Sequence, residues 1–74
     1  MQFQHQDDGQ QGEFFAVNQQ DQRIAEISYV WGGKDQVIAN HTWVDHSLRG
    51  QGVARQLLDV LVAFAREKNL KIIP

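Results

Sequence analysis

The first half of the chain alternates short apolar runs with polar turns, a pattern typical of β-strands. The apolar side chains concentrate in residues 13–18, 24–31 and 36–45. In residues 24–31 both alternating sets of positions carry apolar side chains, so we expect a central strand covered on both faces. Gly32-Gly33 and other short polar segments separate the runs, and short connections favour an antiparallel meander.

The hydrophobic period changes from two to 3.6 after Gly52, which predicts an amphipathic helix. Lys68 places a cation in the last turn of this helix, and Asn69 tolerates the left-handed conformation of a helix exit. Residues 70–73 then begin another strand, so strand, helix and strand form a βαβ unit, normally parallel. The stripe expected to face the sheet comprises Ala54, Leu57, Leu58, Leu61, Val62 and Ala65.

The size of the chain leaves room for one core. Its 74 residues, 42% hydrophobic and 22% charged, predict a single domain over residues 1–74. Its fold class is α+β: an antiparallel meander followed by one β-α-β crossover. A domain this small is marginally stable by itself, so we expect its large aromatic side chains in the core. These are Phe14, Phe15, Tyr29, Trp31, Trp43 and Phe64.

Charge and composition exclude several kinds of function. The net charge of -2 and the pI near 5.8 give no basic surface, so we expect no nucleic-acid partner. The chain has no cysteine for a disulfide or a thiolate site, and its three histidines lack metal-ligand spacing, so no metal is expected. It shows neither a signal-peptide pattern nor the about 20 apolar residues that cross a bilayer. We therefore expect a cytoplasmic protein without a membrane partner.

A glycine-containing loop, Arg49-Gly50-Gln51-Gly52-Val53-Ala54, joins the last meander strand to the helix. Its glycines let successive N–H groups approach one point, and the helix N-terminus adds free N–H groups and a positive dipole end. Such an arrangement binds phosphate. A glycine pair before a helix is nevertheless more often only a tight turn, and the P-loop and dinucleotide patterns are not met. The loop pattern alone therefore leaves both readings open.

The loop matches R/Q-x-x-G-x-G/A, and the chain resembles the GNAT superfamily of N-acetyltransferases. It is especially similar to short single-domain members with an H-T-x-V strand, here His41-Thr42-Trp43-Val44, and a K-I-I-P strand start at residues 71–74. The resemblance covers about residues 14–74 and implies the acyl-CoA N-acyltransferase fold. In such members the last strand continues into a cysteine-bearing segment and a helix, so the resemblance implies a chain truncated at the C-terminus.

The resemblance also implies an acyltransferase that binds acetyl-CoA and transfers the acetyl group to an amine by direct attack. His41 matches the family's histidine and is the candidate proton-transfer residue, because imidazole titrates near neutral pH. A backbone N–H near Val44 would stabilise the developing oxyanion. The residues implied to bind the cofactor are Trp43, Val44, Asp45, Arg49, Gly50, Gln51, Gly52, Val53, Ala54 and Arg55.

Several alternatives stay open. His41 can equally be a hydrogen-bonded structural residue, Glu26 a water-mediated base or a solvated charge, and His46 an exposed turn residue. The acceptor amine has no mark in the sequence. The chain can also be a non-catalytic CoA-binding or self-associating module, because an unpaired strand edge at residues 71–74 invites a homodimer.

Overall fold

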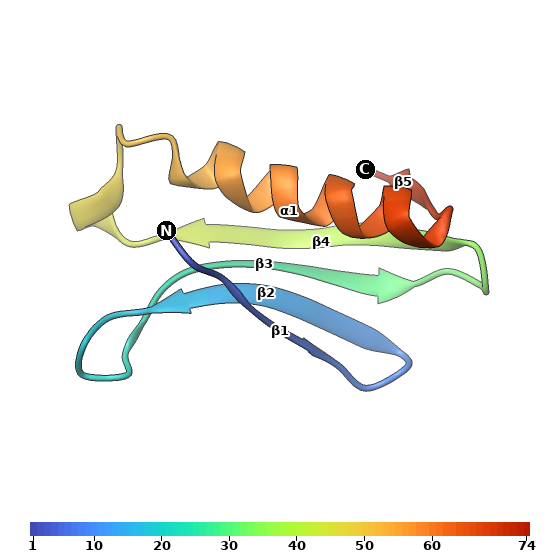
Figure 1. The fold of residues 1–74 in the computed structure, drawn as a ribbon, viewed down its shortest axis with the longest axis horizontal. Helices are drawn as coiled ribbons and strands as arrows, with labels where there is room; N and C mark the ends of the chain where they lie inside the picture. The colour runs from blue at the N-terminus through green and yellow to red at the C-terminus, as the bar shows by residue number, and fades with distance from the viewer.

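The computed structural model describes residues 1–74 as a five-stranded sheet with one helix on one face (Figure 1). The strand order is β1-β2-β3-β4-β5; the first four strands are antiparallel and β5 is parallel to β4. The predicted meander, helix and parallel crossover are therefore confirmed. The elements are β1 (Gln4–Asp7), β2 (Gln11–Val17), β3 (Arg23–Trp31), β4 (Gln36–Val44), the 3-10 helix η1 (His46–Leu48), α1 (Val53–Lys68) and β5 (Lys71–Ile73).

The core lies between α1 and the face of the sheet that it covers. The helix buries every fourth residue, which places these side chains on one face; they are Val53, Leu57, Leu61 and Ala65. They pack against residues of β2, β3 and β4 such as Ile27 and Val37. The expectation that Ala54 and Leu58 belong to the buried stripe is wrong, because both are exposed.

The exit of α1 follows the prediction. Asn69 adopts the left-handed conformation with φ 57° and ψ 45°, and the Leu70 amide donates to the Ala65 carbonyl at 2.7 Å. This cap reverses the chain direction, since a left-handed residue ends the helix and leaves the following residues extended. The chain then enters β5 beside the start of β4.

The second face of the sheet is not covered by a helix, so the expectation that β3 is covered on both faces is wrong. On this open face β3 places half-buried Ile24, Glu26, Ser28 and Val30. Phe15 of β2 is also on this face, yet it is buried: the Arg23 guanidinium carbon lies 4.0 Å from the centre of its ring. One arginine thus protects an aromatic side chain that no helix reaches.

Most of the aromatic residues occupy the core as predicted. Phe14 and Tyr29 are buried in the core, half-buried Trp31 and Phe64 pack against it, and Phe15 is buried on the open face instead. Trp43 does not belong to the core, because its alternation places it on the open face with 36% of its surface exposed.

β4 has two irregular features that position the candidate site. A β-bulge leaves Asn40 without a partner, since Ala39 pairs with Tyr29 and His41 with Ser28. The extra residue reverses the alternation of the strand, so His41 faces the open side although Ala39 faces α1. In addition, β5 pairs only with residues 36–38 of β4. The rest of β4 therefore has a free edge, at the end where the chain enters α1 (Figure 1).

Candidate functional site

The free edge of β4 presents the backbone groups of alternate residues. The Asp45 amide donates to the Ile24 carbonyl at 2.8 Å, so the backbone groups of Asp45 and Trp43 point toward β3. Those of Thr42 and Val44 consequently point toward the free edge. Such unpaired groups can bind an extended chain in the manner of an added strand.

The turn between β4 and α1 is held in a defined shape by Asp45. Its carboxylate accepts hydrogen bonds from the hydroxyl and the amide of Ser47, at 2.5 and 3.0 Å. These bonds, with smaller contributions from His46 and Arg49, lower the pKa of the Asp45 carboxyl below its usual value. An ionised Asp45 therefore caps η1 at the start of the turn.

Gly50 and Gly52 complete the turn with φ of 85° and 75°. These left-handed conformations are unfavourable for residues with a Cβ. A Cβ placed on either glycine would have no atom within 4 Å, so the space in front of the turn is open. The turn therefore requires glycine at both positions for its backbone shape. Because glycine has no side chain, the space in front of the turn also has room for a ligand.

The first turn of α1 faces this open space with free amides. The first helical hydrogen bond runs from the Gln56 amide to the Gly52 carbonyl at 3.1 Å. The Gln51 amide is already engaged, because it donates to the Leu48 carbonyl at 3.3 Å. The free amides and the helix dipole favour an anion at this end of the helix. The amides without a protein acceptor are those of Gly52, Val53, Ala54 and Arg55.

A groove of about 440 Å³ joins the β4 edge to this helix start. Trp43 lies on the open face whereas Thr42 and Val44 lie on the α1 side, so the groove crosses the edge of the strand. The lining contains seven of the ten residues expected from the sequence, and it adds Thr42 and Leu48. Leu48 is the one apolar residue between β4 and α1, which is the only signal that could have found it. The seven are Trp43, Val44, Arg49, Gly50, Gly52, Val53 and Ala54.

Three of the expected residues lie outside this lining. Asp45 caps η1, as described above. The Gln51 side chain is 3.5 Å from the Ser47 carbonyl, and the Arg55 guanidinium is 3.4 Å from the Asp59 carboxylate, one turn further along α1. Each of these side chains has a partner within the turn or the helix.

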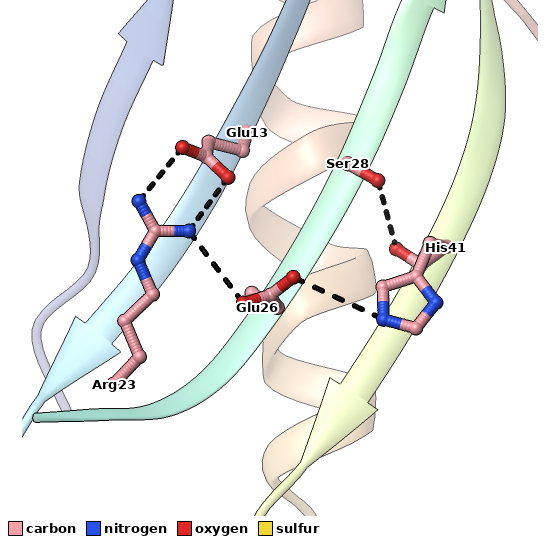
Figure 2. A network of polar contacts seen from close by, with 5 residues as sticks. All are labelled: Glu13, Arg23, Glu26, Ser28 and His41. Atoms are coloured by element: carbon pink, nitrogen blue, oxygen red, sulfur yellow. Dashed lines mark hydrogen bonds and ion pairs between the residues drawn. The ribbon is translucent and has the colours of Figure 1, made fainter.

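His41 lies on the open face, two residues before Trp43 along β4. Its side chain is 56% exposed, and its Nε2 is 3.9 Å from Oε2 of Glu26 on the neighbouring strand (Figure 2). Its carbonyl accepts a hydrogen bond from the Ser28 hydroxyl at 3.4 Å. The imidazole does not line the groove at the β4 edge. His46 is an exposed residue of η1.

Glu26 connects this imidazole to an ion pair on the adjacent strands (Figure 2). Arg23 donates to both carboxylate oxygens of Glu13, at 2.7 and 2.8 Å, and also lies 3.5 Å from Glu26. The Arg23 hydrogen bonds outweigh burial and lower the pKa of the Glu13 carboxyl. One guanidinium serves two carboxylates, so the cluster retains a negative charge beside His41.

The structure contains no group of three or more His, Asp and Glu side chains placed to hold a metal ion. It also contains no helix long and apolar enough to span a membrane.

Solved structures of acetyltransferases share this fold. A ribosomal-protein-alanine N-acetyltransferase from Brucella melitensis biovar Abortus 2308 aligns with a TM-score of 0.75 and 24% identity, over 89% of this chain and 50% of that chain. A protein assigned to the GNAT acetyltransferases, from Staphylococcus aureus subsp. aureus, aligns with a TM-score of 0.75 and 25% identity, over 89% of this chain and 56% of that chain. A GNAT N-acetyltransferase (YhbS) from Escherichia coli, solved in complex with CoA, aligns with a TM-score of 0.69 and 23% identity, over 80% of this chain and 36% of that chain. The chain thus spans about half the length of these proteins or less.

The sequence itself also carries a family signal. No curated protein sequence matches the chain. A family model described as GCN5-related N-acetyl-transferase matches residues 13–74, which include β2 to β5 and the whole candidate site. The chain therefore belongs to the GCN5-related N-acetyltransferase (GNAT) family.

Proposed function

We propose that this chain binds acetyl-CoA at the free edge of β4 and transfers its acetyl group to an amine. The observation that carries the proposal is the groove that joins the unpaired backbone of β4 to the free amides of α1. Family membership supports it, as does the fold shared with an enzyme solved in complex with CoA.

The diphosphate of the cofactor is assigned to the start of α1. The free amides of residues 52–55 and the positive end of the helix dipole suit a phosphate oxygen. Arg49 lines the same groove and supplies a charge-assisted hydrogen bond. The open space in front of Gly50 and Gly52 lets a phosphate approach the backbone closely.

The pantetheine arm is assigned to the β4 edge. This arm is extended and contains amide groups, so it can pair with backbone groups like an added strand. Thr42 and Val44 direct their N–H and C=O groups toward this edge, whereas Trp43 offers its side chain. The thioester then lies beside β4.

The proposed reaction is a direct attack by the nitrogen of a neutral amine on the thioester carbonyl. The C–N bond forms, the C–S bond breaks and coenzyme A leaves as a thiolate that takes up a proton. An alkylamine with a pKa of about 10.4 is mostly protonated at neutral pH, so a base is required to remove a proton from the amine. His41 is assigned to accept the amine proton, and the free N–H of Val44 to stabilise the oxyanion.

Titration of the ¹⁵N-labelled chain with acetyl-CoA tests the binding step. We expect saturable amide shifts at residues 50–55 and at Thr42 and Val44. If the amides of residues 50–55 do not shift at millimolar acetyl-CoA, the cofactor assignment is wrong.

Turnover distinguishes an enzyme from a module that only binds CoA. We expect release of free thiol from acetyl-CoA when a panel of amines is added, in excess of hydrolysis without amine. Saturable binding without amine-dependent thiol release would support the non-catalytic alternative.

A further inference from the structure

The imidazole of His41 presents its two nitrogens to different surroundings. Its Nε2 lies 3.9 Å from Oε2 of Glu26 on the neighbouring strand, and the Ser28 hydroxyl donates to its backbone carbonyl (Figure 2). The lone-pair directions of the two ring nitrogens diverge, so Nδ1 lies on the side of the ring turned away from Glu26 and β3 (Figure 2). The edge of β4 opposite β3 is the free edge, beside which the thioester is assigned.

Glu26 is itself held in place on the sheet. Its side chain is only 25% exposed, and its Oε1 lies 3.5 Å from the Arg23 guanidinium. Arg23 is held in turn by two hydrogen bonds to Glu13, at 2.7 and 2.8 Å, and by the contact of its guanidinium with the Phe15 ring. A side chain that is already ordered loses little further conformational entropy when it acts on a neighbour. The carboxylate therefore has a defined position beside His41.

The position of this carboxylate selects the nitrogen of His41 that carries the proton. In a neutral imidazole one nitrogen is a donor and the other an acceptor, and the surroundings of each decide which. A distance of 3.9 Å is longer than a hydrogen bond, so Glu26 acts on the ring through its negative charge. That charge stabilises a proton on the nearer nitrogen, Nε2. Nδ1 then keeps its lone pair.

We propose that Glu26 is a positioning residue, which holds the proton of His41 on Nε2 so that Nδ1 accepts the proton of the acceptor amine. As the C–N bond forms, the amine proton passes to Nδ1, and the C–S bond breaks with its electron pair on the sulfur. The imidazolium returns the proton to solvent through its exposed ring, and the departing thiolate takes a proton from solvent. Glu26 exchanges no proton itself. The catalytic role of His41 rests on the proposed function, whereas the position of its proton can be measured on the chain alone.

Ring ¹⁵N shifts of His41 test the position of the proton in the free chain. Long-range ¹H–¹⁵N spectra at about pH 9, where an unperturbed imidazole is neutral, distinguish Nε2–H from Nδ1–H. We expect mainly Nε2–H in the unsubstituted chain and a larger share of Nδ1–H in Glu26→Gln. The glutamine amide keeps the size of the side chain, removes its charge and can either donate or accept. Mainly Nδ1–H in the unsubstituted chain, or the same balance in both chains, would overturn the proposal.

The matched control is Asp21→Asn in the β2–β3 turn. It removes one negative charge from the chain, and asparagine suits the left-handed conformation of this residue, which has φ 63°. We expect the His41 ring shifts to stay as in the unsubstituted chain. A change as large as that in Glu26→Gln would show that net charge, and not the position of Glu26, sets the balance, and would overturn the proposal.

Kinetics test whether the position of this proton matters to the reaction. We expect Glu26→Gln to lower kcat for amine-dependent thiol release about twofold to fivefold, the value of one exposed ion pair, with KM for acetyl-CoA unchanged. In a His41→Ala background the same substitution should have no further effect, because Glu26 acts through the imidazole. A full effect of Glu26→Gln in that background would overturn the proposal, since Glu26 would then act on the amine as a water-mediated base.

The two kinds of measurement separate this inference from the proposed function. Mainly Nε2–H in the free chain together with no amine-dependent thiol release would refute acetyl transfer and support the effect of Glu26 on the ring. Thiol release with an unchanged kcat in Glu26→Gln would refute the positioning role and support acetyl transfer.

Discussion

At the scale of single residues, Gly52 combines two requirements that substitution can separate. Its φ of 75° disfavours any residue with a Cβ, and the absence of a side chain keeps the space before the free amides open. The first requirement concerns stability of the turn and the second concerns access of a phosphate. Asparagine tolerates the left-handed conformation far better than alanine, yet it fills the same space.

We expect Gly52→Ala to lower the free energy of unfolding by about 1 to 2 kcal/mol, and Gly52→Asn to lower it less. Both variants should weaken acetyl-CoA binding, because each places a side chain beside the free amides. Urea unfolding and amide titration on the same samples measure the two effects. An alanine variant as stable as the asparagine variant would contradict the role of backbone conformation.

Asp7 ties β1 to β3, as does His5, whose Nε2 lies 2.8 Å from the Tyr29 hydroxyl. Its carboxylate accepts hydrogen bonds from the Tyr29 hydroxyl at 2.5 Å and from the Trp31 indole at 3.0 Å. Burial alone would raise the pKa of this carboxyl, but the hydrogen bonds from Tyr29, the Gly9 amide and Trp31, together with His5, lower it below 3.8.

The lowered pKa of Asp7 predicts a loss of stability in acid. The unfolded chain binds the proton at higher pH than the folded chain, so the contribution is present above about pH 4 and is lost as the pH falls through the folded pKa. We expect Asp7→Asn to reduce the dependence of the unfolding free energy on pH below about pH 4. Asp8, Glu13 and Asp45 have carboxyl pKa values shifted in the same direction, so a smaller slope remains. Urea unfolding at several pH values measures the slope of the unfolding free energy against pH. An unchanged slope in Asp7→Asn would contradict the role assigned to the Asp7 carboxyl.

At the scale of elements, α1 shows how far sequence patterns reach. Two apolar stripes run along this helix at intervals of four residues, one beginning at Val53 and the other at Ala54. Both satisfy the helical period, so the pattern predicts the helix but cannot decide which stripe faces the sheet. The direction in which the chain leaves Gly52 decides it, and Leu61 is buried while Leu58 is 45% exposed.

Two leucines of α1 provide a matched test of this assignment. Leu61→Ala should lower the free energy of unfolding by about 2 to 5 kcal/mol, because it leaves a cavity in the core. Leu58→Ala removes the same atoms from an exposed position, so we expect a change within about 0.5 kcal/mol. Urea unfolding measures both values. Comparable losses in the two variants would show that the second stripe is also buried.

The strands show the same limit. Alternation and turn residues predict β2, β3 and β4, and the loop motif predicts most of the groove at the β4 edge. The bulge at Asn40 has no signal in the sequence, because one polar residue in a strand is ordinary. Since the bulge sets which residue lies opposite Ser28 and Glu26, the contact between His41 and Glu26 could not be predicted either.

At the scale of the whole molecule, the chain has one helix layer and one small core, so its stability is sensitive to a bound ligand. The groove at the β4 edge is formed by segments that meet only in the folded state, namely the end of β4 and the start of α1. A ligand bound there therefore favours the folded chain over the unfolded one.

We expect acetyl-CoA at one hundred times its Kd to stabilise the fold by about 2.7 kcal/mol and to raise the Tm. Pantetheine lacks the diphosphate and should give a smaller rise at equal concentration, because it leaves the amides of residues 52–55 unpaired. Thermal unfolding monitored by circular dichroism measures both shifts. Equal rises for the two ligands would contradict the diphosphate assignment.

The bulge in β4 also makes the length of this strand a determinant of chemistry. If the same residues paired without the bulge, with Asn40 opposite Ser28, His41 and Trp43 would exchange sides with Thr42 and Val44. The groove at the β4 edge would then lose its present lining without the substitution of any residue in it. Changes in length should therefore be tolerated in the Gly32–Asp35 turn, whereas an added residue in the strand that follows would need a second bulge to keep these side chains on their present sides. Strand length as well as residue identity should then distinguish chains that keep the groove at the β4 edge.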